Sequence, residues 1–181
     1  MAVTERRQGI SIFRAAEATD LMATDFMSAP EMSQAAREGL SGAVGAGAAM
    51  GAEVKVLARD AGGFSLVHVW FKPNYPLPRH SHDADCMYYV ISGSAVMGNQ
   101  TLRAGDAFFV PEDAPYQYNA GPEGVEVLEV RHGVARFDMK IPDASPQRWK
   151  AMLDTVEANR AGWADLPVSP TLAANGATGA R

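Results

Sequence analysis

The amino-acid sequence predicts an all-β domain with flanking helices, and three observations lead to this fold class. From residue 52 onward, short apolar runs alternate with turns rich in glycine, proline and aspartate, which is typical of successive strands. Before residue 52 the composition favours helices, and after Ser145 apolar residues recur at helical spacing. We therefore expect a partly helical N-terminal extension (1–51), a β-rich domain (52–140), a C-terminal helix (141–166) and a disordered tail (167–181).

Composition and charge exclude several classes of function. A chain of 181 residues can form one domain with a sizeable core. Its net charge of −5 argues against nucleic-acid and membrane partners, because binding to their anionic surfaces requires a basic face. The first residues lack the apolar stretch of a signal peptide and no stretch could span a membrane, so we expect a cytoplasmic protein.

The N-terminal extension contains several short predicted elements. Ile10–Phe13 is compatible with a strand and Ala15–Phe26 with a helix. A second helix is predicted from Pro30 to about Leu40, since proline is pre-organised for a first helical turn. Ser41–Gly51 is rich in glycine, which costs about 1 kcal/mol per residue in a helix, so we expect a loop there.

The run F-S-L-V-H-V-W-F, residues 64–71, is apolar almost throughout and predicts a strand with both faces covered. His68 lies in its middle and shares a face with Trp70. His68 is either a core histidine with a hydrogen-bonding neighbour or a residue that contributes a third imidazole to a functional site.

The stretch Y-P-L-P-R-H-S-H-D-A-D-C-M-Y-Y-V-I-S-G, residues 75–93, organises the rest of the chain. Its prolines keep the chain extended, and residues two apart on a strand point to the same face. His80 and His82 should therefore direct both imidazoles into one cavity. Two neutral imidazoles form half of a typical transition-metal site, so we expect a metal there.

The same alternation places further side chains near the two histidines. Tyr116 and Tyr118 share one face of a later strand, and Cys86 and Tyr88 share a face of the strand after the histidines. We expect Cys86, Tyr88 and Tyr116 to line the cavity. As the only cysteine, Cys86 cannot form an intramolecular disulfide, and is a ligand, a redox-active thiol or a packing residue.

Two segments resemble the motifs of the cupin superfamily. H-S-H-D-A-D-C-M-Y-Y-V-I-S-G is similar to the first cupin motif, and L-R-A-G-D-A-F-F-V-P-E-D-A-P-Y-Q-Y-N, residues 102–119, is similar to the second. The resemblance spans residues 54–137 and implies a cupin β-barrel, also called a double-stranded β-helix or jelly roll. It implies that His80 and His82 are metal ligands. Cys86 replaces the usual glutamate of the first motif, and Tyr116 replaces the histidine of the second.

The last strand, residues 125–132, ends at His132, which we interpret as a solvated strand-end residue. Ser145 and Pro146 then predict the start of a helix that runs to about Ala161. Its apolar residues at i, i+3, i+4 and i+7 should pack on the barrel or on a partner. We expect a homodimer, because small β-barrels often pair through a sheet edge.

These residues predict a metal-dependent enzyme that acts on a small, largely apolar or aromatic substrate with hydroxyl or carbonyl groups. His80, His82 and Cys86 are the predicted metal ligands, Tyr116 and Tyr88 the catalytic groups, and the substrate-binding residues are His68, Trp70, Phe108 and Tyr118. One divalent transition metal is expected, with iron placed first and zinc, nickel, copper or manganese as alternatives.

Three functions fit this set of residues. The first is a non-haem iron dioxygenase, which uses open metal positions for substrate and dioxygen. The second is a metal-assisted lyase, isomerase or cyclase in which a tyrosine moves a proton. The third is a small-molecule-binding protein without catalytic activity. We rank the dioxygenase first.

Overall fold

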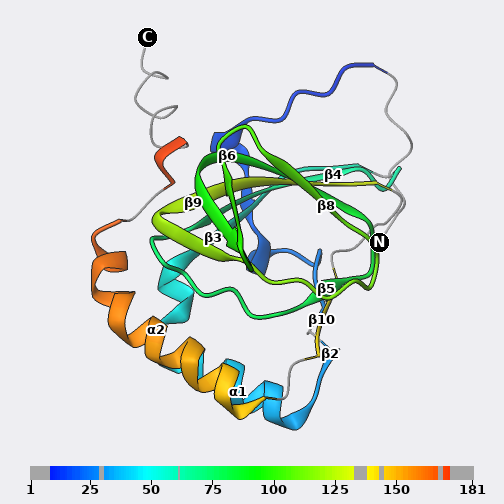
Figure 1. Cartoon of the computed structure of the whole chain (residues 1–181). Coiled ribbons are helices and arrows are strands. Elements are labelled where there is room, and N and C mark those ends of the chain that lie inside the picture. Colours follow the sequence, from blue (N-terminus) through cyan, green and yellow to red (C-terminus); the bar gives the residue numbers. More distant parts are fainter. Residues whose placement is uncertain are drawn as a thin grey trace.

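Two sheets and two α-helices make up the computed structural model, which describes residues 9–28, 31–60, 62–132, 138–142, 145–166 and 169–171 (Figure 1). The larger sheet has the order β1-β3-β4-β9-β6-β7, with β8 paired to β6. Its strands are β1 (Thr19–Asp20), β3 (Ala52–Arg59), β4 (Ser65–Phe71), β6 (Cys86–Met97), β7 (Gln100–Arg103), β8 (Ala107–Val110) and β9 (Asn119–Arg131).

A smaller sheet closes the end of the barrel that holds the two histidines. It has the order β2-β10-β5, where β2 is Glu31–Met32, β5 is Ser81–His82 and β10 is Met139–Ile141. The pair of β2 and β10 is parallel, and every other pair of described strands is antiparallel. The structure confirms the predicted all-β class with flanking helices.

The barrel core lies between the inward faces of β4, β6 and β9. Val67 on β4, Val90 on β6 and Val127 on β9 are fully buried. Val69 on β4, Tyr88 on β6 and Val125 on β9, each two residues away, are also buried on the same side, because side chains alternate along a strand. The central parts of the three strands therefore present an apolar face to the interior.

The two helices, α1 (Gln34–Gly45) and α2 (Pro146–Ala164), pack against each other beside the sheets (Figure 1). The side chain of Ser33 caps α1 through the backbone N–H of Ala36, and Ser145 caps α2 through that of Arg148. The carbonyl of Trp163 near the end of α2 accepts a hydrogen bond of 2.7 Å from Lys72 Nζ. This contact fixes α2 to the chain segment that leads into the histidines.

The N-terminal extension differs from the sequence prediction in several respects. Ile10–Phe13 does not form a strand, and the second helix begins at Gln34 rather than at Pro30, because Ser33 caps it and Glu31–Met32 pairs with β10 instead. Ala15–Phe26 does not form a helix, and its described structure consists of two 3₁₀ turns, η1 (Ala15–Glu17) and η2 (Leu21–Ala23), with β1 between them. Helix α1 continues five residues beyond Leu40 to Gly45, into the glycine-rich stretch that predicted a loop, before the 3₁₀ turn η3 (Ala48–Gly51). Packing against α2 stabilises this extra helix.

The chain after α2 is described only at residues 169–171, so most of the predicted disordered tail lies outside the described residues. Ser169 is fully buried and its hydroxyl donates a hydrogen bond to Glu126. The expectation of disorder is therefore wrong for these three residues. None of the described helices is long and apolar enough to cross a membrane.

Candidate active site

His80 and His82 both line one cavity, as the H-x-H spacing predicts. His80 forms an isolated antiparallel bridge with Tyr116, and His82 pairs with Met139 as part of β5. Each histidine is only 4% exposed, and the centroids of their rings are 4.9 Å apart at nearly right angles. The extended backbone thus places two imidazoles side by side at the cavity wall.

The backbone carbonyl beside each ring fixes which of its nitrogens carries the proton. His80 Nδ1 lies 2.8 Å from the carbonyl oxygen of Pro78, and His82 Nδ1 lies 3.1 Å from that of Asp138. A carbonyl oxygen only accepts, so in the neutral ring Nδ1 carries the proton and Nε2 keeps its lone pair. Metal-binding histidines usually have this arrangement, in which a second partner orients the ring.

Burial keeps both rings neutral at physiological pH. It lowers the pKa of His80 to about 4 and that of His82 to about 2, and the positive charge of Arg131 adds to the effect in both rings. Neutral imidazole is the form that binds metal ions.

The cavity has a volume of about 440 Å³ and a mostly apolar wall. It lies at the junction of the barrel with the N-terminal extension and α2, and its apolar side chains include Leu21, Leu40, Val54, Val69, Phe71 and Met152. Glu129 contributes a carboxylate to the wall of the same cavity. Such a site suits a small apolar molecule that carries a few polar groups.

Glu129 is the functional candidate that sequence reasoning missed. It lies on β9 opposite Tyr88, on the inward face, and is 5% exposed. Arg131, two residues along the same face, donates a hydrogen bond of 2.8 Å from Nη2 to Glu129 Oε2. Burial raises the pKa of Glu129 to about 7 although Arg131 opposes this shift. A signal was present in the sequence, since Val125, Val127, Glu129 and Arg131 alternate on one strand face.

Tyr88 and Tyr116 form a hydrogen-bonded pair, but contrary to the sequence prediction neither they nor Phe108 are among the described residues that line the cavity. Their hydroxyl groups are hydrogen-bonded to each other, and the ring of Tyr116 lies 4.4 Å from that of His80 between centroids. Tyr88 stacks on Phe108 at 4.5 Å. Burial raises the pKa of both tyrosines well above the ordinary value, and the charge of Glu129 raises them further. The phenols are therefore hydrogen-bond donors, which favours an orienting role over that of a base.

Cys86 and Tyr118 belong to the packed interior beside the cavity. Neither is among the described residues that line it. Burial and the neighbouring Glu129 raise the pKa of the Cys86 thiol to about 11. Tyr118 is 1% exposed and packs against Phe71 and Phe108. This position favours packing, one of the readings open for Cys86, over metal ligation.

His68 and Trp70 face away from the cavity, so the structure does not support their predicted contact with a substrate. In β4 the cavity is lined by Val69 and Phe71, which point to the opposite face. His68 Nε2 instead lies 3.6 Å from Glu126 Oε1, and Trp70 is paired with Glu126 in the sheet register. A third imidazole from His68 therefore cannot reach His80 and His82. His132 is exposed, as expected for a strand-end residue.

The donor atoms at the cavity fit a transition metal in part. His80 and His82 offer two neutral nitrogen donors from rings whose orientation is fixed. Among the described residues, no group of three histidine, cysteine, aspartate or glutamate side chains is gathered closely enough to hold a metal ion. Two carboxylates line the same cavity, the exposed Asp20 and the buried Glu129.

No protein-family model matches the sequence, and no curated protein matches it either. Several solved structures resemble the chain over about half its length. An RmlC-like cupin from Shewanella frigidimarina is 25% identical over 46% of this chain and 78% of its own, with a TM-score of 0.42. KdgF from Halomonas sp. is 23% identical over 46% and 82%, with a TM-score of 0.41. The polyketide cyclase RemF from Streptomyces resistomycificus is 20% identical over 60% and 82%, with a TM-score of 0.47.

The fold follows from the strand order and the position of the two motifs. Antiparallel strands in two layers enclose the core, as in a jelly roll. The segment with His80 is bridged to the segment with Tyr116, so that both motif regions meet beside one cavity. This arrangement identifies the chain as having the cupin fold.

Proposed function

We propose that the chain is a metal-dependent enzyme that transfers a proton on a small, largely apolar substrate, as a lyase, isomerase or cyclase does. The observation that carries this proposal is the combination in one apolar cavity of two neutral imidazoles and a carboxylate whose pKa is about 7. A group with a pKa near the working pH both accepts and returns a proton efficiently.

Each group at the cavity has a separate task in this reaction. His80 and His82 would hold the metal, which as a Lewis acid would supply polarisation of a substrate carbonyl. Glu129 accepts the proton from the substrate, and Arg131 holds its carboxylate in place through the 2.8 Å hydrogen bond. Tyr116 does not line the cavity, and its ring, 4.4 Å from that of His80, would help to hold the imidazole in place. The apolar walls of the cavity keep water away from the groups between which the proton is transferred.

The dioxygenase that the sequence ranked first becomes the second candidate. Two histidines and one carboxylate on a single metal form the set of ligands that non-haem iron oxygenases use, and His80, His82 and Glu129 all line this cavity. The carboxylate of Glu129, however, is paired with Arg131 rather than gathered with the histidines. This pairing favours a role for Glu129 in proton transfer over a role as a metal ligand.

Metal analysis tests the proposal first. Protein purified without chelators should contain close to one equivalent of a transition metal, and a His80→Ala/His82→Ala double variant should contain almost none. Cys86→Ser is the matched control, because its side chain does not line the cavity. Equal and negligible metal in the wild type and the double variant would refute a metal enzyme.

Turnover assays then separate the two candidate reactions. A panel of small apolar hydroxy acids, diketones and phenols is assayed in air and under argon, with oxygen uptake recorded. Proton-transfer chemistry predicts equal turnover in both atmospheres and no oxygen uptake. Turnover that stops under argon would instead establish the dioxygenase.

We also propose that the chain forms a homodimer through the outer face of β6 and β8. Met87, Tyr89 and Phe109 are 44%, 46% and 54% exposed there, and Met87 is paired with Phe109 across the two strands. The N-terminal segment carries further exposed apolar side chains, Ile10 and Ile12, that could cover this face in a second copy. Exposed apolar patches of this kind are typical of protein interfaces.

A further inference from the structure

The cavity extends along the strands of the barrel. Glu129 of β9 is paired with Val67 of β4. Phe71, four residues further along β4, is paired with Ala52 of β3. Four residues of strand cover about 13 Å. Glu129, Ala52 and Phe71 all line the cavity, so one cavity connects these two levels of the barrel.

The end of the cavity at Glu129 is its polar end. The carboxylate of Glu129 accepts a hydrogen bond from Arg131. The charge of Arg131 also lowers the pKa of both His80 and His82, and this effect weakens with distance, so the two imidazoles lie toward the same end. The groups that are proposed to bind the metal and to move the proton are therefore at the end away from Phe71.

The end at Phe71 is apolar, and two alanines leave space in it. Phe71 stacks on Tyr75 with ring centroids 4.8 Å apart, and both residues line the cavity. Ala48 in η3 and Ala52, where η3 passes into β3, line it as well. Larger side chains at these two positions would occupy the space that the alanines leave. Ala48 and Ala52 therefore set the length of the cavity.

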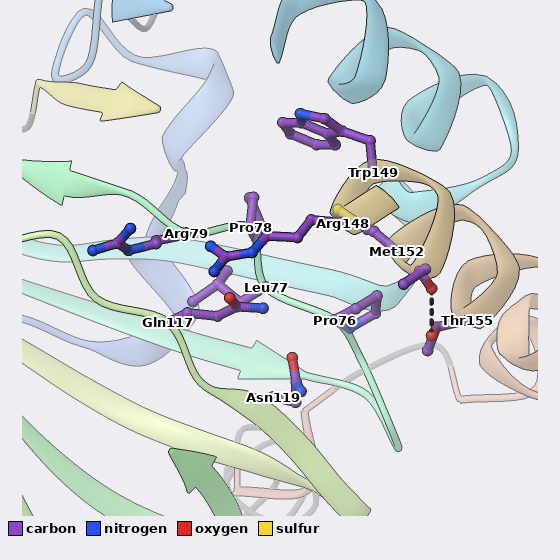
Figure 2. Close-up of a pocket in the computed structure, with 11 residues that line it drawn as sticks. Pro76, Leu77, Pro78, Arg79, Gln117, Asn119, Arg148, Trp149, Met152 and Thr155 are labelled. Carbon is purple, nitrogen blue, oxygen red and sulfur yellow. Dashed lines mark hydrogen bonds between the residues drawn. The ribbon is translucent and has the colours of Figure 1, made fainter. Parts of the chain in front are cut away.

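The wall that connects the two ends is also apolar. Leu77 and Pro78 lie on the segment between Tyr75 at the apolar end and His80 at the polar end, and Met152 of α2 lines the cavity beside them (Figure 2). A molecule that extends from one end to the other would contact this wall along its length.

The charges at the cavity favour a neutral ligand. Asp20 and Glu129 contribute carboxylates, and the described residues that line the cavity include no lysine or arginine. A ligand with a carboxylate at the polar end would be repelled by Glu129, with no cation in the wall to offset the repulsion. A carbonyl group carries no such penalty.

We propose that the cavity binds a neutral carbonyl compound with an extended alkyl tail, and that Ala48 and Ala52 determine the length of tail that fits. The carbonyl group lies at the polar end with His80, His82 and Glu129, and the tail reaches Phe71. The assignment of this compound as the substrate rests on the proposed function, whereas its binding requires only the shape and charge of the cavity.

Isothermal titration calorimetry with the full-length protein tests this inference. Nonan-2-one is the long probe, pentan-2-one the short one and nonanoate the anionic one. Nonan-2-one should bind at least about tenfold more tightly than pentan-2-one, because each additional buried methylene group favours binding. It should also bind at least about tenfold more tightly than nonanoate, because only nonanoate is repelled by Glu129.

Leucine variants at the apolar end test the length of the cavity. Ala48→Leu and Ala52→Leu should each weaken nonan-2-one binding by about fivefold or more, because the added side chain occupies the space of the tail. Pentan-2-one does not reach this end, so its affinity should stay within about twofold of the wild type. Ala151→Leu is the matched control, since Ala151 is an exposed alanine on α2 that does not line the cavity, and it should bind all three probes like the wild type. Circular dichroism confirms that each variant is folded, and the second leucine variant preserves the test if the first does not fold.

Several results would overturn the proposal. They are a wild type that binds no nonan-2-one, binds both ketones equally, or binds nonanoate as tightly as nonan-2-one. Equal losses of the two ketones in the leucine variants, or unchanged nonan-2-one affinity in both variants, would overturn it as well.

The His80→Ala/His82→Ala variant separates this inference from the proposed enzyme. Its preference for nonan-2-one over pentan-2-one should persist, because the contacts of the tail do not involve the metal. A protein that contains metal and turns over a substrate, but does not prefer the longer ketone, would refute the inference alone. A protein that prefers the longer ketone but never contains metal would refute the enzyme alone.

Discussion

His80 and Tyr116 are joined by two backbone hydrogen bonds, with the N–H of each residue donating to the carbonyl oxygen of the other at 3.0 and 2.9 Å. Their rings lie 4.4 Å apart between centroids. The bridge places the phenol that replaces the expected histidine directly beside the first predicted ligand. The hydroxyl of Tyr116 is in turn hydrogen-bonded to that of Tyr88.

Because the hydroxyl groups of Tyr88 and Tyr116 are hydrogen-bonded to each other, the effects of removing them on stability should be coupled. Tyr88→Phe or Tyr116→Phe leaves the other buried hydroxyl without its partner, so each should lower the free energy of unfolding by about 1–2 kcal/mol. The double variant should cost less than the sum, since no orphaned hydroxyl remains. Urea denaturation at pH 7.5 measures this, with Tyr89→Phe on the exposed face as the control. Strictly additive costs would contradict the coupling.

Glu129→Gln should reduce turnover by about 10²- to 10⁴-fold, because the amide cannot accept a proton from the substrate. The metal content should stay at the wild-type value if the histidines hold the metal alone. Steady-state kinetics with the substrate found in the panel, together with metal analysis, gives both results. Loss of metal in Glu129→Gln would make Glu129 a ligand and favour the dioxygenase.

The sequence was sufficient to predict that the two histidines share one face. The alternation of side chains along a strand and the extended conformation imposed by the preceding prolines both depend only on neighbouring residues. Spacing alone placed His80 and His82 on one face, and the two motif regions predicted the strands that bring Tyr116 to them. The helix capped by Ser145 followed equally from local signals.

Which face of β4 points toward the core could not be predicted in the same way. A strand that is apolar on both faces gives no indication of which face is the core, so His68 and Trp70 were assigned to the wrong one. Glu129 was missed because a charged residue on a strand is usually solvated, and only the neighbouring Arg131 allows its burial. The length of α1 depends on its packing against α2, and this packing cannot be predicted from the local sequence.

Gly39 and Gly42 on α1 provide a test of that helix packing. A Cβ atom on Gly39 would lie 2.2 Å from the indole of Trp149, whereas one on Gly42 would meet nothing within 4 Å. Gly39→Ala should therefore destabilise the protein by about 1–3 kcal/mol through overpacking. Gly42→Ala should stabilise it by about 0.5–1 kcal/mol through higher helix propensity. Thermal denaturation compares the two variants, and equal shifts would contradict the contact.

Tyr89→Ser with Phe109→Ser should shift the protein from dimer to monomer. Both side chains are about half exposed in a single chain, so their replacement costs little folding energy and removes apolar area from the proposed interface. Sedimentation velocity over a range of concentrations measures the shift. A wild type that sediments as a monomer at every concentration would refute the interface.

The stability of the fold should depend on pH through Glu126, a residue that does not line the cavity. Burial by itself raises the pKa of Glu126, but polar contacts from His68, Ser169, Ser92 and Thr171 outweigh this and hold the pKa below its ordinary value. The ionised carboxylate therefore stabilises the fold above the pKa of the unfolded chain, and this contribution is lost as the pH falls below about 4.5.

Glu126→Gln isolates this contribution, because the other titrating groups cancel in the comparison with wild type. At pH 7 the variant should be less stable by about 1–3 kcal/mol, since the amide accepts fewer of the hydrogen bonds that Ser92 and the segment after α2 donate. The difference should shrink as the pH is lowered through 4, where the wild-type carboxylate begins to protonate in the unfolded chain. Urea denaturation at pH 7, 5 and 4 measures it. A difference that stays constant or grows toward low pH would show that the charge of Glu126 does not stabilise the fold.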